Sequence, residues 1–174
     1  MRARIVGVVF VLGLAAVGAG VAGLNRNWST HANGSMEVPA RDTQGQGQAI
    51  FHLSQDGTQL DYKVIASNIE NVFQAHIHMA PAGVNGGIVV WLFPSTTPNV
   101  LGPLGAGRTD GVLAQGTITA ANLVGTLLNQ PLSALLEALN SGNAYVNIHT
   151  NDGNPATSLI PGDFPGGEIR GDVK

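Results

Sequence analysis

Two histidines separated by a single residue are the strongest chemical signal in the sequence. His76 and His78 lie in residues 72–79, where polar and apolar side chains alternate. Side chains of a β-strand point to opposite faces with a period of two, so this pattern predicts a strand whose two imidazoles share its polar face, about 6–7 Å apart. Neutral imidazole is a ligand of zinc and copper, so two such rings on one rigid strand can share a metal ion. The same face can equally be a hydrated sheet surface.

A third histidine lies on a second predicted strand, far along the chain. Residues 144–150 also alternate, and His149 falls on the polar face of that strand. Three protein ligands with one open position are a common arrangement at reactive zinc sites. If pleating brings the two strands together, His76, His78 and His149 form a candidate metal site on the solvent side of the sheet, and copper or zinc is the expected ion.

The same histidines also fit an interpretation without metal. Polar groups at a folded surface are normally hydrogen-bonded, so the rings can tie the sheet to its loops through neighbouring polar side chains. With a metal present, the same neighbours would instead orient the ligating rings. These neighbours are Asn147, Thr150, Glu168 and Arg170. Glu168 and Arg170 are two residues apart and share a strand face, where a weak surface ion pair is a further alternative.

The remaining two histidines are expected to play a smaller part. His52 falls on the outward face of a predicted strand at residues 48–54, where it is either a fourth ligand or, more simply, a lone exposed side chain. His31 lies in a segment rich in Asn, Ser and Thr near the start of the mature chain, and we expect it to face solvent. Neither is needed for a site with three histidine ligands.

Short alternating runs separated by glycine and proline predict the elements that must position these side chains. The chain has 24 glycines and 9 prolines, and strands are predicted at residues 48–54, 58–66, 72–79, 87–93, 111–118, 144–150 and 167–173. One helix is predicted over residues 131–140, because Pro131 suits a first helical turn, leucines recur at helical spacing and Gly142 follows its end. A shorter helical turn follows Thr119. We therefore expect an all-β antiparallel sandwich with one or two short helices in a crossover.

The first residues carry the pattern of a targeting segment. Two arginines precede an uncharged apolar run over residues 5–24, which ends in small residues that a signal peptidase accepts. We predict a signal peptide at residues 1–23, with an uncleaved N-terminal anchor as the alternative. Residues 24–34 are then the flexible start of the mature chain, and residues 35–174 form one folded domain. Either form makes the protein secreted or extracytoplasmic, in the periplasm or at the cell surface.

Composition excludes several functional classes. Charged residues make up 11% of the chain and the formal net charge is −3, so the sequence offers no basic surface for nucleic acid. Cysteine is absent, which removes thiol catalysis and thiolate metal sites and leaves stability to packing, hydrogen bonds or a bound ion. Beyond the uncleaved form of the N-terminal segment, nothing in the sequence predicts contact with a membrane.

Several short motifs, taken in order, resemble the CHRD domain, a module named for chordin and widespread in secreted bacterial proteins. They are Met-Glu-Val-Pro at 36–39, Ala-His-Ile-His at 75–78, Gly-x-Asn-Gly at 83–86, Tyr-Val-Asn-Ile-His-Thr at 145–150 and Gly-Glu-Ile-Arg-Gly at 167–171. The resemblance runs from about residue 35 to residue 173 and implies an extracytoplasmic β-sandwich module. It implies little about activity, because most family members have no assigned reaction. The loop after Thr150 is longer here than is usual in the family.

The sequence leads to two functional hypotheses. The first is a non-catalytic extracytoplasmic module that binds an unidentified protein or matrix partner and carries the histidine site in addition. The alternative is a copper- or zinc-binding protein for metal handling or redox protection. A His-x-His strand with a distant histidine is similar to the copper site of Cu/Zn superoxide dismutase, and the expected sandwich is of the immunoglobulin-like or superoxide-dismutase-like kind. No enzymatic activity is expected, because that enzyme's bridging histidine and zinc ligands have no counterparts in this sequence.

Overall fold

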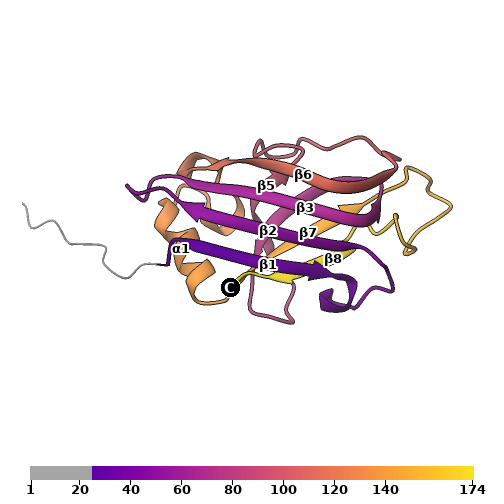
Figure 1. The fold of residues 1–174 in the computed structure, drawn as a ribbon, viewed down its shortest axis with the longest axis horizontal. Coiled ribbons are helices and arrows are strands. Elements are labelled where there is room, and N and C mark those ends of the chain that lie inside the picture. Colours follow the sequence, from indigo (N-terminus) through magenta and orange to yellow (C-terminus); the bar gives the residue numbers. More distant parts are fainter. Residues whose placement is uncertain (1–24) are drawn as a thin grey trace, which may run out of the picture.

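Eight antiparallel strands form a single sheet in the computed structural model, which describes residues 25–174 (Figure 1). The predicted signal peptide or anchor at residues 1–23 lies outside the described residues. The strands are β1 (Asn27–Asn33), β2 (Gln46–Leu53), β3 (Leu60–Glu70), β4 (Val72–Met79), β5 (Gly87–Phe93), β6 (Arg108–Ile118), β7 (Ala144–Thr150) and β8 (Ile169–Asp172). The prediction of an all-β, antiparallel fold is confirmed.

The sheet curls into a nearly closed barrel. Its strand order is β5-β4-β7-β8-β1-β2-β3-β6, and the half formed by β5, β4, β7 and β8 lies behind the half formed by β1, β2, β3 and β6 in Figure 1. The two halves join where β8 meets β1, through the Asn33–Arg170 pair and the backbone hydrogen bonds between Ser29 and Lys174. Because strand twist accumulates across eight strands, the two layers of the expected sandwich are halves of one continuous sheet.

Alternation along the strands fills the space between the two halves with apolar side chains. Ala75 and Ile77 of β4 point inward, as do Val146 and Ile148 of β7, and all four belong to the buried core. Successive side chains of a strand point to opposite faces, so the residues between these four point away from the core. That second face of β4 and β7 carries the three candidate ligands.

The helical elements are short and lie mostly in the crossover from β6 to β7. They are the 3-10 turns Gly34–Met36, Ala120–Asn122 and Gly125–Leu127, and the helix α1 (Leu132–Asn140). The prediction of a helix at residues 131–140 is confirmed, and its leucine stripe packs into the core. The indole N–H of Trp28 donates to the Asn140 side chain at 3.1 Å and so ties β1 to the helix. No helix among the described residues is both long enough and apolar enough to cross a membrane.

The expectation of a flexible start over residues 24–34 is wrong for residues 27–33, which form β1. This strand pairs with β2 along its whole length. Its outward face holds Asn, Ser and His residues, while Trp28 and Ala32 reach the core. The polar composition of the segment concealed the alternation that marks a half-buried strand. His31 is exposed, as predicted.

Candidate metal centre

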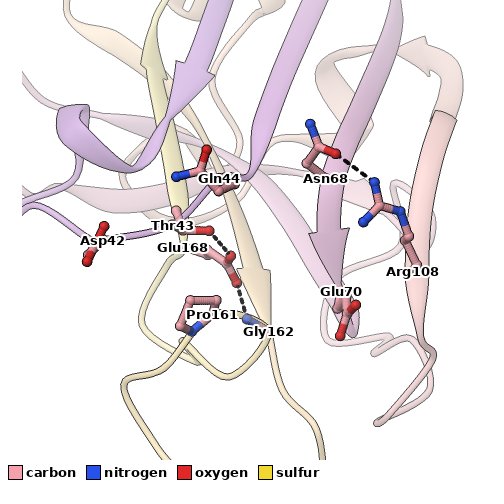
Figure 2. A pocket seen from close by; sticks show the side chains of 9 residues that line it. All are labelled: Asp42, Thr43, Gln44, Asn68, Glu70, Arg108, Pro161, Gly162 and Glu168. Atoms are coloured by element: carbon pink, nitrogen blue, oxygen red, sulfur yellow. Dashed lines mark hydrogen bonds between the residues drawn. The ribbon is translucent and has the colours of Figure 1, made fainter.

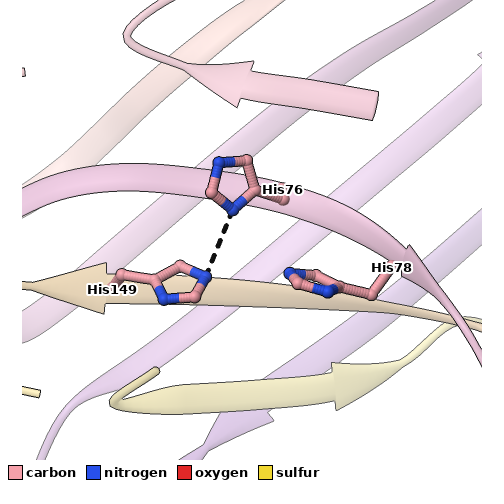
Figure 3. Close-up of side chains that lie close together, drawn as sticks. All are labelled: His76, His78 and His149. Atoms are coloured by element: carbon pink, nitrogen blue, oxygen red, sulfur yellow. Dashed lines mark hydrogen bonds between the residues drawn. The ribbon is translucent and has the colours of Figure 1, made fainter. Parts of the chain in front are cut away.

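His76, His78 and His149 lie together on the outer face of the β4–β7 pair (Figure 3). The register places Gln74 opposite His149 and His76 opposite Asn147, so these side chains leave the same face of the sheet. Each histidine offers one ring nitrogen, and the three atoms lie within 4.8 Å of one another. In Figure 3 the rings of His78 and His149 point toward each other below that of His76. The strands predicted to carry the three rings are therefore neighbours, and the rings meet.

The prediction of a solvent-facing cluster is correct about the face and wrong about exposure. The three histidines are exposed by only 0%, 8% and 5%, in chain order. Two loops cover this face and contribute backbone carbonyls to the rings: the turn loop (residues 80–86) and the long loop (residues 151–168). Strand periodicity determines which face a side chain takes, but the loops that cover that face depend on contacts distant in sequence.

Backbone carbonyls determine the orientation of two of the rings. The Nδ1–H of His78 donates to the Gly86 carbonyl at 3.0 Å. The Nδ1–H of His149 donates to the Pro165 carbonyl at 3.0 Å. A carbonyl oxygen only accepts, so in each neutral ring the proton is on Nδ1 and Nε2 carries a lone pair. Histidines that ligate metals typically have this arrangement, in which one ring nitrogen bonds an outer partner and the other is free.

Of the ring nitrogens that face one another in the cluster, only that of His78 has no hydrogen-bond partner among the described residues. His76 Nδ1 lies 3.2 Å from His149 Nε2 and can donate to it. The Nε2 atoms of His76 and His78 are buried and have no hydrogen-bond partner among the described residues. Buried polar atoms are seldom unpaired, because an orphan acceptor loses its hydration without compensation. The Nε2 lone pairs of His78 and His149 face the same buried space as His76 Nδ1, an arrangement that a bound cation would satisfy.

Burial keeps all three imidazoles neutral. It lowers the pKa of His76 from 6.5 to about 2, and charge repulsion from His149 and His78 adds to the effect. Burial also lowers the pKa of His149 to about 4, with a smaller contribution from His78. The pKa of His78 is lowered mainly by burial as well, against the opposing hydrogen bond to Gly86. Metals bind the neutral ring, so the cluster is in its ligand form at neutral pH without losing a proton to solvent.

Aromatic side chains enclose the histidines. The Trp91 ring meets His76 edge to face, with 4.3 Å between the ring centroids. Tyr145 stacks on His78 at 4.9 Å with 11° between the ring planes, and Phe73 approaches the third imidazole edge-on at 6.4 Å. Trp91 and Tyr145 are both buried. These rings restrict rotation of the imidazoles and shield the cluster from bulk water.

The four polar residues expected around the histidines are buried but bond elsewhere. They are Asn147, Thr150 and Glu168, which were expected to hydrogen-bond to the rings, and Arg170, which was expected to pair with an acidic neighbour. The expectation of direct bonds is wrong because backbone carbonyls of the two covering loops already occupy the outer ring nitrogens of His78 and His149. Two of the four nevertheless affect the site, because they anchor the loops that supply those carbonyls.

Glu168 anchors the long loop. Its carboxylate accepts from the Thr150 hydroxyl at 2.6 Å and from the Gly162 N–H at 2.9 Å, and Figure 2 shows the second of these bonds. Thr150 is the last residue of β7 and Gly162 lies within the long loop, so the carboxylate connects this loop to the end of β7. The same loop carries the Pro165 carbonyl, and Glu168 therefore positions His149 indirectly.

Arg170 anchors the turn loop in the same way. Its guanidinium lies 3.5 Å from the centroid of the Tyr145 ring and 3.2 Å from the Asp172 carboxylate. It also donates to the carbonyls of Val84 at 3.0 Å and Pro81 at 3.4 Å, both in the turn loop. The interpretation of Arg170 as part of a weak surface ion pair is wrong, because the residue is only 1% exposed.

Glu37 is a buried acid that the sequence did not single out, although it belongs to a motif of the family resemblance. Its residue is 6% exposed, and Asn147 donates to its carboxylate at 3.4 Å. Burial raises the pKa of Glu37 from 4.5 to about 7, against the lowering effects of Arg170 and Arg41. Glu37 is buried because the fold brings Asn147 of β7 beside the segment that follows β1, so its burial could not be recognised from the sequence.

Replacing Glu37 with glutamine should change how stability depends on pH. The folded pKa is raised, so between about pH 4.5 and 7 the folded state keeps a proton that the unfolded state loses, and the free energy of unfolding falls as pH rises through this window. Relative to wild type, Glu37→Gln should gain up to about 3 kcal/mol between these limits. Urea unfolding of both metal-free proteins across the window measures the difference. A constant difference would show that folding does not raise the pKa of Glu37.

Other features of the described residues lie apart from the histidine cluster. The hollow in Figure 2, of about 350 Å³, has no histidine in its lining, which consists of Asp42, Thr43, Gln44, Asn68, Glu70, Arg108, Pro161, Gly162 and Glu168. His52 is exposed on β2, and its Nδ1 lies 2.7 Å from the Asn27 side-chain oxygen. It is outside the cluster, so the simpler expectation of a lone exposed histidine describes it.

Together, the fold and the site define a small, nearly closed antiparallel β domain with a buried histidine cluster beneath two loops. The chain matches the CHRD domain over residues 28–160, and it belongs to that family. The matched residues include all three histidines, Glu37 and Asn147. No curated protein and no solved structure matched the chain.

Proposed function

We propose that this CHRD domain is a non-catalytic, extracytoplasmic module that binds one copper or zinc ion through His76, His78 and His149. One observation carries the proposal. Backbone carbonyls hold the outer nitrogens of His78 and His149, so that their Nε2 lone pairs face the third ring in a buried space. A bound cation would give the Nε2 atom of His78 the partner that it lacks, and imidazole suits copper and zinc better than it suits calcium or magnesium.

The spacing of the rings supports this proposal. Metal–nitrogen bonds of 2.0–2.1 Å put ligand nitrogens about 3.3–3.6 Å apart in tetrahedral or trigonal sites. His76 Nδ1 and His149 Nε2 are 3.2 Å apart, and no pair of the three ligand atoms exceeds 4.8 Å. The widest pair therefore has to close by roughly 1 Å, a change that small side-chain rotations supply. The ligands are largely arranged before the ion arrives.

Enclosure supports a binding role rather than catalysis. All three rings lie beneath loops and aromatic side chains, so a substrate would have to displace both to reach the ion. Metal handling or redox protection outside the cytoplasm needs only reversible capture of an ion. The extracytoplasmic location follows from the apolar N-terminal run and is part of the proposal. A protein or matrix partner stays a prediction.

Added metal should stabilise the purified, natively secreted protein. At a free ion concentration 100 times the dissociation constant, binding to the folded state adds about 2.7 kcal/mol. For a domain of this size the melting temperature should then rise by about 8 °C. Elemental analysis should find one copper or zinc ion per chain, and calcium or magnesium should leave the melting temperature unchanged. The proposal would be contradicted by a protein that retains no copper or zinc when purified and whose melting temperature does not change when copper or zinc is added.

A further inference from the structure

The histidine cluster offers an ion only neutral ligands. The chain has no cysteine, so no thiolate is available. The charges that shift the pKa values of the three rings come from one another and from Arg170, and none of them is a carboxylate. The ion's own charge would therefore remain uncompensated within the cluster. That charge becomes the property that distinguishes zinc(II) from copper(I), because both ions have a filled d shell without geometric preference of its own.

A buried positive charge lies one aromatic ring beyond His78. Arg170 is buried, and its guanidinium packs on the Tyr145 ring, which also stacks on the His78 imidazole. Its acidic partner Asp172 lies farther out, with 17% of its side chain exposed. Glu37 approaches the same face through Asn147, but its carboxyl is protonated below about pH 7. A dication in the cluster meets twice the repulsion from Arg170 that a monocation meets.

Burial adds a second cost for a dication. The penalty for moving an ion out of water rises with the square of its charge, and all three ligating residues are nearly or fully buried. Zinc bound by three histidines ordinarily completes its shell with water. Here Trp91, Tyr145 and the covering loops occupy the surroundings of the rings. A copper(I) ion is satisfied by three nitrogen ligands and needs no water.

From the neutral ligands, the burial and the adjacent guanidinium, we infer that the cluster of His76, His78 and His149 takes copper(I) in preference to zinc(II). This inference depends on the proposed metal site and narrows it to the monovalent ion. Copper(II) is disfavoured on separate grounds, because it prefers a tetragonal set of ligands that three buried imidazoles do not provide. The protein would then carry reduced copper outside the cytoplasm and shield it from solvent.

Competition titrations on the whole chain test the inference. Under anaerobic conditions at about pH 6.5, where the Glu37 carboxyl is mostly protonated, copper(I) is titrated against a copper(I)-specific chelator and zinc(II) against a zinc indicator. We expect one copper(I) ion per chain, bound at least about 100-fold more tightly than zinc(II). Equal affinities, or tighter zinc binding, would overturn the inference and leave the proposed metal site standing. Failure to bind either ion would overturn both.

Two isosteric substitutions test the electrostatic cause. Asn147→Asp places a carboxylate between the cluster and Arg170, so it should favour the dication and reduce the preference for copper(I) about tenfold. Asp172→Asn removes the acidic partner of Arg170 and should increase the preference. Circular dichroism establishes that each variant is folded before titration. If neither substitution changes the preference for copper(I), charge does not explain that preference. A weaker preference in Asn147→Asp together with a stronger one in Asp172→Asn supports the electrostatic explanation.

Discussion

His149→Asn should lower the affinity of the domain for copper or zinc by more than about 100-fold, since losing only an outer partner of a ligating histidine costs about 10–100-fold. Asparagine places an amide N–H near the position of the imidazole Nδ1, so the hydrogen bond to the Pro165 carbonyl can persist. The Nε2 ligand is removed, and with it the contact to His76. The variant therefore separates metal binding from the anchoring of the long loop.

The matched control for this substitution is His52→Asn. His52 is exposed on β2 and its Nδ1 also has a side-chain partner, Asn27, but it lies outside the cluster. Titration calorimetry should find that His52→Asn binds the metal with the same affinity as the wild-type protein. Thermal unfolding without metal should show that His149→Asn is folded. Metal binding that survives in His149→Asn at full affinity, or that is lost in His52→Asn, would contradict the proposed ligand set.

Arg170→Met should lower the free energy of unfolding of the metal-free protein by about 3–5 kcal/mol. The guanidinium is buried, and its removal leaves the Asp172 carboxylate without its partner. The carbonyls of Val84 and Pro81 also lose their donor, and the Tyr145 ring loses its cation. Methionine retains most of the apolar volume, so the change reports mainly on the lost polar contacts.

Two companion variants sharpen that measurement. Arg170→Lys keeps the charge but not the planar fork that reaches a carboxylate and two carbonyls together, so it should recover only part of the lost stability. Arg108→Met removes an arginine that pairs with Asp110 at 2.5 Å on the surface, where both side chains are about half exposed. Its urea midpoint should equal that of the wild-type protein. Equal midpoints for Arg170→Met and Arg108→Met would show that the buried guanidinium contributes nothing to stability.

The loss of Arg170 should also reach the histidines through the turn loop. The guanidinium holds the carbonyls of Val84 and Pro81, and the same loop presents the Gly86 carbonyl to His78. A Cβ on residue 86 would collide with the Met79 carbonyl, so glycine is required for this close approach. Stability and ligand orientation therefore depend on the same few contacts, which lie between β8 and the end of β4.

The sequence by itself determined the local features of the protein. A period of two in residues 72–79 and 144–150 placed all three histidines on strand faces opposite the core, and both strands form as expected. The leucine spacing near residues 132–140 predicted the helix α1. Such periodicities follow from backbone geometry, which repeats over a few residues and needs no knowledge of distant segments. The candidate ligands could be chosen for this reason.

Only the tertiary structure decided what surrounds those ligands. The pairing of β4 with β7 joins segments far apart in the chain, and two loops then turn an outward polar face into a buried one. The same closure buries Arg170 and Glu37 and assigns the outer ring nitrogens to the Gly86 and Pro165 carbonyls. Any residue can supply a carbonyl, so no side-chain pattern marks such partners. Burial and orientation at this site result from packing between distant segments, which no local period encodes.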